Sequence, residues 1–175
     1  MTDDPSAQDR VRLTTRTGFT FEVRPAHPGD EAALGAFFAR VSQDDLRFRF
    51  LSASPKVSEG QIEAMTHVDH RITEDFLVFE PGSQTIIASA MLAGDERLDA
   101  AEVAVSIDAG FKGRGVGWTL LEHVARCARA RGFRRLQSIE SRANHAAIEL
   151  EQEMGFTARP FEDDPALVLL EFKLA

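Results

Sequence analysis

The residues best suited to chemistry form a short glycine-rich segment, Phe-Lys-Gly-Arg-Gly-Val-Gly-Trp, at positions 111–118. Glycines at 113, 115 and 117 lack the Cβ atoms that would hold an anion away from the backbone. The segment therefore has the composition of a loop whose backbone N–H groups contact phosphate oxygens directly.

The surroundings of this loop indicate how many charges it binds. A strand-like segment at 102–108 precedes it, and a helical pattern that lasts to Arg131 follows, so the unpaired N–H groups of the first helical turn face the loop. A helix end stabilises one charge by only about 0.3–1 kcal/mol, which favours two phosphates over one. Lys112 and Arg114 add positive charge. A pyrophosphate group is the expected ligand.

Two familiar nucleotide-binding motifs do not match the loop. The dinucleotide fingerprint requires Gly-x-Gly-x-x-Gly, whereas the spacing here is Gly113-x-Gly115-x-Gly117. The phosphate loop of nucleotide hydrolases ends in Gly-Lys-Ser/Thr, whereas Trp118 and Thr119 follow the last glycine. Neither motif explains the segment.

Composition limits the class of protein. With 175 residues, 43% of them hydrophobic, the chain is long enough for one well-buried core. The net charge of −8 argues against a nucleic-acid-binding surface, because such affinity depends on neutralising phosphates. The arginine-rich stretch at 126–135 is interpreted as cations that complement a helix end.

The single cysteine, Cys127, excludes an internal disulfide and a thiolate metal cage, which suits a reducing cytoplasm. The polar, acidic start of the chain resembles no signal peptide, and the apolar stretch 86–93 is too short to span a bilayer. We therefore expect a cytoplasmic protein without a membrane partner.

Hydrophobic periodicity predicts the elements that hold the loop. Residues 1–17 are polar and aperiodic and are predicted to be a flexible leader, followed by one domain over residues 18–175. Alternation and turn signals predict strands, and spacings of three and four predict helices. The strands are expected near 19–23, 76–79, 85–92, 101–107, 136–139 and 167–172, and the helices near 30–41, 44–50, 58–67, 116–131 and 144–154.

This order of elements predicts a fold of the α/β (α+β) class. The first half is rich in strands, and the second alternates strands with helices. The arrangement favours a central mixed, mostly antiparallel sheet with helices on both faces.

The loop resembles the acetyl-coenzyme A motif of the GNAT (Gcn5-related N-acetyltransferase) superfamily, Gln/Arg-x-x-Gly-x-Gly/Ala. Lys112 stands where the motif has Gln or Arg, and two later segments, Asn144-x-x-Ala147-x-x-Leu150 and Met154-Gly-Phe, resemble the Asn-x-x-Ala and Leu-Gly-Phe segments of the family. The likeness spans about residues 23–172 and implies a GNAT fold, acetyl-CoA as cosubstrate and no metal.

The resemblance implies a pose for the cosubstrate. Its pyrophosphate would lie on the loop amides, its pantetheine along strand 101–107, and its thioester between splayed strands. Many relatives use a tyrosine as general acid after the Asn-x-x-Ala-x-x-Leu segment, but this chain has no tyrosine, and Glu151 occupies that place. A tyrosine acid is therefore excluded, and either solvent protonates the thiolate or the thiolate leaves unaided. The cofactor-binding residues implied are Val103, Ala104, Val105, Lys112, Gly113, Arg114, Gly115, Val116, Gly117, Trp118 and Asn144.

Glu102 is the candidate general base. A lysine with a pKa near 10.4 is neutral in only about one part in a thousand near pH 7.4, a penalty of roughly 4 kcal/mol for the nucleophilic form. A carboxylate that takes the proton from the amine addresses this penalty. Glu102 lies on the polar face of the strand expected to carry the thioester.

A narrower resemblance concerns the acceptor. Asp45-Leu-Arg-Phe-Arg-Phe-Leu51, Thr66-His-Val-Asp69 and Ala101-Glu-Val-Ala-Val105 resemble the acetyltransferase domain of bacterial Pat-type protein lysine acetyltransferases. In that family the glutamate matching Glu102 is the proposed base. The resemblance implies a protein lysine as acceptor.

Other groupings of residues carry weaker signals. His67 and His70 lie three residues apart beside Asp69, but without an evident third ligand they indicate a polar helix end rather than a metal pair. His123 and Cys127 are expected to pack along a helix. The charged residues Asp44, Asp45, Arg47 and Arg49 suit either an acceptor entrance or a solvated helix.

Three functions follow, with the first preferred. The leading hypothesis is an acetyl-CoA-dependent N-acetyltransferase that acts on a protein lysine by direct attack. The alternatives are the same chemistry on a small-molecule amine, and a non-catalytic acyl-CoA-sensing module. Homodimer formation is left open.

Overall fold

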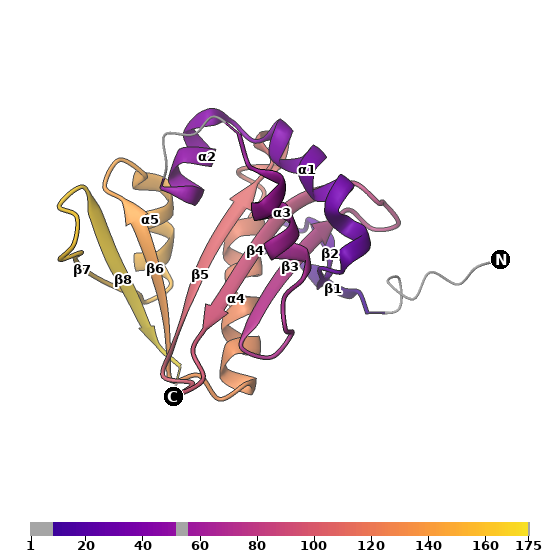
Figure 1. Cartoon of the computed structure of the whole chain (residues 1–175). Helices are drawn as coiled ribbons and strands as arrows, with labels where there is room; N and C mark the ends of the chain where they lie inside the picture. Colours follow the sequence, from indigo (N-terminus) through magenta and orange to yellow (C-terminus); the bar gives the residue numbers. More distant parts are fainter. Residues whose placement is uncertain (1–8, 52–55, 175) are drawn as a thin grey trace.

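The strands form one eight-stranded sheet in the order β1-β2-β3-β4-β5-β6-β8-β7 (Figure 1). The computed structural model describes residues 9–51 and 56–174. Neighbouring strands are antiparallel except β5 and β6, which are parallel. The strands are β1 Val11–Thr14, β2 Thr20–Pro25, β3 Thr73–Phe79, β4 Ile86–Gly94, β5 Ala100–Ile107, β6 Arg135–Ser141, β7 Thr157–Pro160 and β8 Leu167–Lys173.

Helices cover both faces of the sheet (Figure 1). The first three pack over one face around a core that includes Phe37, Leu77 and Phe79. The other two pack over the opposite face, where Leu120 and Leu136 are fully buried. The helices are α1 Glu31–Arg40, α2 Gln43–Phe50, α3 Glu59–Thr66, α4 Val116–Ala130 and α5 His145–Glu153, with short 3-10 turns at Pro28–Asp30 and Ala109–Phe111.

The predicted mixed, mostly antiparallel sheet flanked by helices is confirmed. The capping box predicted before α3 is present, since the Ser58 side chain accepts a hydrogen bond from the N–H of Gln61 at 3.1 Å and the Gln61 side chain accepts one from the N–H of Ser58 at 2.8 Å. The apolar stripe of α4 faces the sheet, with Val116, Leu120 and Val124 buried. Local sequence signals therefore agree with tertiary packing in these elements.

The flexible leader predicted over residues 1–17 is wrong for Val11–Thr14, which form β1. This edge strand is mostly exposed, so it carries no alternation of buried and polar residues. It forms because its backbone pairs with β2, with Val11 opposite Val23 and Thr14 opposite Thr20. Strand β7 was missed for a related reason, since it is a mostly exposed edge strand whose partner is β8. Residues 1–8 lie outside the described part of the chain.

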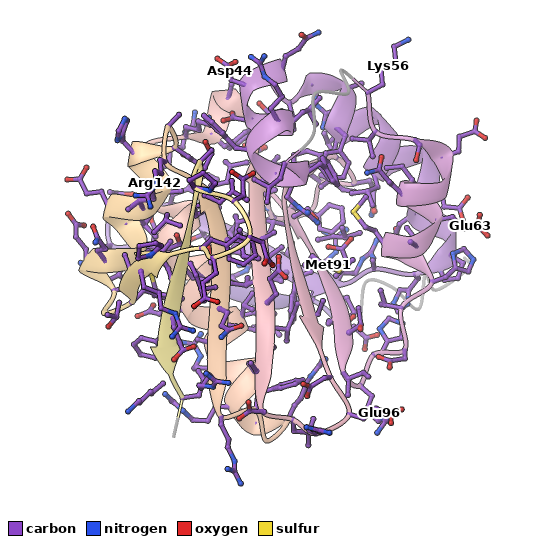
Figure 2. All side chains as sticks on the ribbon, turned by 60° about the vertical axis from the view of Figure 1, so that its left-hand side comes forward. Asp44, Lys56, Glu63, Met91, Glu96 and Arg142 are labelled. Carbon is purple, nitrogen blue, oxygen red and sulfur yellow. The ribbon has the colours of Figure 1, made fainter. Side chains whose placement is uncertain are left out.

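The sheet splits between β5 and β6. Strand β5 pairs with β4 from Ala101 to Ile107, but it pairs with β6 only from Ala100 to Glu102. Beyond Glu102 the two strands diverge towards the end of the sheet that carries α2 (Figure 1). Asp44 of α2 lies at this end, whereas Glu96, in the β4–β5 loop, lies at the other (Figure 2). The split exposes one backbone edge of β5.

A buried acid in the middle of the sheet makes stability depend on pH. Asp75 of β3 is 0% exposed, and burial raises its pKa to about 7, although a hydrogen bond from Ser89 and the charge of Arg49 oppose the rise. From about pH 4 to pH 7 the folded chain holds a proton that the unfolded chain has lost. Stability therefore falls as the pH rises through this window.

The Asp75→Asn variant is accordingly expected to be more stable than the parent at pH 8, by about 5 °C in Tm, and to lose this advantage near pH 4. Asparagine keeps the acceptor for Ser89 and removes the buried charge. Thermal melts at both pH values check this, with Asp163→Asn at an exposed position as control. A variant less stable than the parent at pH 8 would contradict the assignment.

Candidate active site

A cavity of about 370 Å³ lies where β5 and β6 diverge. Its walls come from β5, from the loop before α4, from α2, and from β6 with α5. The predicted site residues line it, apart from Arg114: Glu102, Val103, Ala104, Val105, Lys112, Gly113, Gly115, Val116, Gly117, Trp118 and Asn144. The structure thus gathers residues from three separate parts of the sequence around one space.

The glycine loop forms a concave backbone surface at the start of α4. Gly113 and Gly115 have φ angles of +76° and +84°, a region that residues with a Cβ rarely adopt. The first bond within the helix runs from the N–H of Thr119 to the carbonyl of Gly115 at 3.2 Å, so the N–H groups of residues 116–118 precede it. These donors and the helix dipole suit a pyrophosphate.

The space around these glycines differs from one to the next. A Cβ on Gly115 would lie 3.1 Å from the Thr15 Cβ, and one on Gly117 would lie 3.3 Å from the Ile107 Cδ1. A Cβ on Gly113 would meet no atom within 4 Å and would occupy open space beside the cavity. Gly115 and Gly117 therefore let the loop pack closely against Thr15 and Ile107, and the absence of a side chain at Gly113 leaves space beside the cavity for an anionic ligand.

The β1–β2 hairpin holds the loop in place. The Thr17 hydroxyl donates a hydrogen bond to the Arg114 carbonyl at 2.7 Å. The Arg114 guanidinium carbon lies 5.5 Å from the centre of the Phe19 ring and 4.9 Å from that of Phe111. Arg114 therefore packs on aromatic rings and is absent from the cavity lining. The cavity does not support the cofactor contact that the family resemblance implied for this residue.

Lys112 connects the loop to α2. Its ammonium group forms an ion pair with Asp45, and both residues line the cavity. The sequence left open whether this charged segment lines an acceptor entrance or only solvates a helix. Asp45 lines the cavity beside the glycine loop. Asp44 instead pairs with Arg47 within α2, and both are exposed.

Glu102 lies at the last position where β5 and β6 pair, opposite Gln137. Its side chain is exposed and lines the cavity. Arg49 of α2 also lines the cavity, and burial lowers its pKa, while the charges of Asp75, Glu102 and Glu140 oppose that shift. The site thus places a cation where it feels the charge of the candidate base, and it gives Arg49 a place in the cavity wall.

The wall formed by β6 and α5 carries two carboxyl groups that sequence reasoning did not combine. Glu140 accepts hydrogen bonds from the Ser138 hydroxyl at 2.9 Å and from the Asn144 amide at 3.3 Å. Glu151 is 5% exposed. Side chains alternate along β6, so Ser138 and Glu140 lie on the same face as the buried Leu136. This alternation is the sequence signal that could have placed both residues on the side of the sheet covered by α5.

The other groupings remain structural. His70 Nδ1 lies 2.7 Å from Glu74 Oε1, and Cys127 Sγ lies 3.7 Å from His123 Nε2 along α4. Across residues 9–51 and 56–174, no group of three or more His, Cys, Asp or Glu side chains could hold a metal ion. In the same ranges no helix is both long and apolar enough to cross a membrane.

An eight-stranded mixed sheet that splits beside a glycine-rich helix start is the fold of the acetyltransferases that use acyl-CoA. Residues 41–156 match the sequence profile of the acetyltransferase (GNAT) family. The chain belongs to this family, and the predicted resemblance to it is confirmed. It is therefore an acetyltransferase, and the family implies an acyl-CoA cosubstrate.

Individual relatives agree with this assignment. The chain is 28% identical over 149 residues to acetyltransferase PA5475 of Pseudomonas aeruginosa, covering 84% of this chain and 80% of that protein. It is 26% identical over 163 residues to the streptothricin acetyltransferase of Streptomyces lavendulae, covering 82% and 85%.

A solved structure, the GNAT domain of S. lividans PAT, superposes with a TM-score of 0.86 at 29% identity and covers 95% of this chain and 98% of that chain. A cAMP-binding acyltransferase from Mycobacterium smegmatis shares the fold at 22% identity and a TM-score of 0.65, and the chain covers 47% of its length.

Proposed function

We propose that the chain transfers the acetyl group of acetyl-CoA to a primary amine, with a protein lysine as the preferred acceptor and Glu102 as the general base. One observation carries the proposal: Glu102 lines the same cavity as the glycine loop, at the vertex where β5 and β6 part. The likeness to the GNAT domain of S. lividans PAT supports the lysine acceptor.

The residues that would hold acetyl-CoA follow from the walls of the cavity. The amides of residues 113–118 would bind the pyrophosphate. The edge of β5 over Val103–Val105, which does not pair with β6, offers backbone donors and acceptors to the pantetheine. Asn144 is engaged as the cap of α5 and as a donor to Glu140, so we assign it to positioning that wall. When bound, acetyl-CoA supplies a thioester, an activated acyl group.

Glu102 would take the proton from the attacking amine, directly or through a water molecule. A lysine ammonium must lose this proton before its nitrogen can attack, and near neutral pH the loss costs roughly 4 kcal/mol. The exposed carboxylate faces the cavity, so an amine that enters between β5 and α2 could meet it. The net charge of −8 favours the approach of cationic acceptors.

A labelling experiment tests the acceptor. The purified protein is incubated with radiolabelled acetyl-CoA and desalted or undesalted cell extract, and label is counted in macromolecules and small molecules separately. We expect label in protein that disappears with Glu102→Gln. Label confined to small molecules would support the second candidate, a small-molecule amine acetyltransferase, which the likeness to streptothricin acetyltransferase favours.

A further inference from the structure

The wall of the cavity opposite β5 carries two carboxyl groups that take no part in deprotonating the amine. Glu140 of β6 and Glu151 of α5 both line the cavity. Their side chains lie within hydrogen-bonding reach of each other. Ionised carboxylates only accept hydrogen bonds, so a bond between two carboxyl groups requires that one of them hold a proton.

The surroundings of the pair place that proton on Glu151. Both oxygens of Glu140 already accept hydrogen bonds, from Ser138 and from Asn144, and these bonds favour its ionised form. The Oε2 atom of Glu151 is buried, and no donor reaches it within the described ranges. A buried oxygen without a donor is where a proton is most stable.

The electrostatics agree with this placement. Burial and then the charge of Glu140 raise the pKa of Glu151 to about 8. The groups that face the pair are Ser138, Asn144 and, from α2, Arg49, whose charge acts on Glu140. Glu151 is thus a neutral acid at physiological pH that lines the cavity.

We propose that Glu151 is the general acid of acetyl transfer and gives its proton to the sulfur of coenzyme A. This inference rests on the proposed function. The amine nitrogen forms the bond to the acetyl carbon, the carbon–sulfur bond breaks, and its electron pair stays on sulfur. Glu151 then protonates that sulfur and becomes a carboxylate. Glu102 holds the proton taken from the ammonium, and the second proton that the nitrogen loses on becoming an amide passes to water. Both groups return to their starting states by exchange with water.

The location of the two carboxyl groups suits separate roles. Glu102 lies on the β5 wall of the cavity and Glu151 on the α5 wall, so base and acid face the ligand from different sides. Proton transfer by a positioned acid raises a rate by about 10²–10⁴-fold for typical leaving groups. A thiolate leaves more readily than most such groups, so we expect a contribution at the low end of this range.

Titration of the free protein tests whether Glu151 holds the proton. Carboxyl carbons of glutamate are labelled with ¹³C and followed by NMR from pH 4 to pH 10. We expect a resonance that titrates near pH 8, is lost in Glu151→Gln, and persists in Glu149→Gln, an exposed neighbour on α5. Glu140→Gln removes the charge that raises this pKa and should move the titration to lower pH. Absence of a resonance specific to Glu151 above pH 6 would overturn the proposal.

Kinetics test whether the proton is used. We expect Glu151→Gln to lower kcat about 10- to 100-fold with acetyl-CoA affinity unchanged, and to lose the fall in kcat that the parent shows above about pH 8. Glu149→Gln should match the parent. If Glu102→Gln is inactive while Glu151→Gln matches the parent at every pH, the acid role is wrong and the proposed function stands. If no preparation transfers acetyl groups, the proposed function fails and the acid role fails with it.

Discussion

The Glu102→Gln variant is expected to bind acetyl-CoA as the parent does and to transfer the acetyl group about 10²–10⁴ times more slowly. Glutamine keeps the size of the side chain but cannot take up a proton at neutral pH. The next residues on the same face of β5, Ala104 and Ser106, are not bases either, so the strand offers no substitute. Single-turnover release of coenzyme A gives the rate, and calorimetric titration gives the Kd of acetyl-CoA.

A matched glutamate separates loss of the base from loss of negative charge. Glu96→Gln removes the same charge from an exposed residue at the far end of the sheet, and its rate should equal that of the parent (Figure 2). Glu102→Asp, which keeps the carboxylate and shortens its reach, should fall between the parent and the glutamine variant. Equal activity of Glu102→Gln and the parent at pH 7 would exclude the base role.

The Gly113→Glu variant is expected to bind acetyl-CoA at least about 100-fold more weakly than the parent. The new side chain would occupy the open space beside the cavity and bring a negative charge to the pyrophosphate. Like charges 4 Å apart repel by about 1 kcal/mol in water and about 4 kcal/mol near a protein surface, where 1.4 kcal/mol is tenfold in Kd. Equilibrium titration of acetyl-CoA measures the change.

Gly82 offers a close control for this change. It has the same φ of +76°, and a Cβ there would likewise meet no atom within 4 Å, but it lies in the β3–β4 hairpin. Gly82→Glu should share any backbone strain and leave the Kd of acetyl-CoA unchanged. Gly113→Gln, which adds bulk without charge, should give an intermediate loss. Retained binding in Gly113→Glu would refute the loop as the phosphate site.

Elements with strong periodicity could be predicted from the sequence. Helix α4 carries an apolar stripe and β5 alternates, so each kind of element follows from spacing alone. The glycine loop could be placed between them because its residue types have a mechanical reason to occur at that junction. For the same reason most residues predicted to bind the cosubstrate do line one cavity.

The remainder depends on contacts between residues far apart in the chain. Strand β1 owes its form to β2, and local pattern could not reveal it. The pairing of Glu140 with Glu151 depends on how α5 lies against β6, and Arg49 reaches the cavity only because α2 lies over the split in the sheet. Such contacts determine the pKa values of Arg49, Glu140 and Glu151. Their roles could therefore not be predicted from the sequence alone.

The hairpin support of the glycine loop bears on how far the protein can be shortened. Residue 18, where the sequence suggests that the domain begins, would be a natural place to truncate it for biochemical work. Such a truncation would remove β1, together with the Thr17 hydroxyl that bonds the Arg114 carbonyl and the Thr15 side chain that packs beside Gly115. The shortened enzyme would retain every residue of the cavity but lose the support of the amides proposed to bind phosphate, so its affinity for acetyl-CoA is expected to fall.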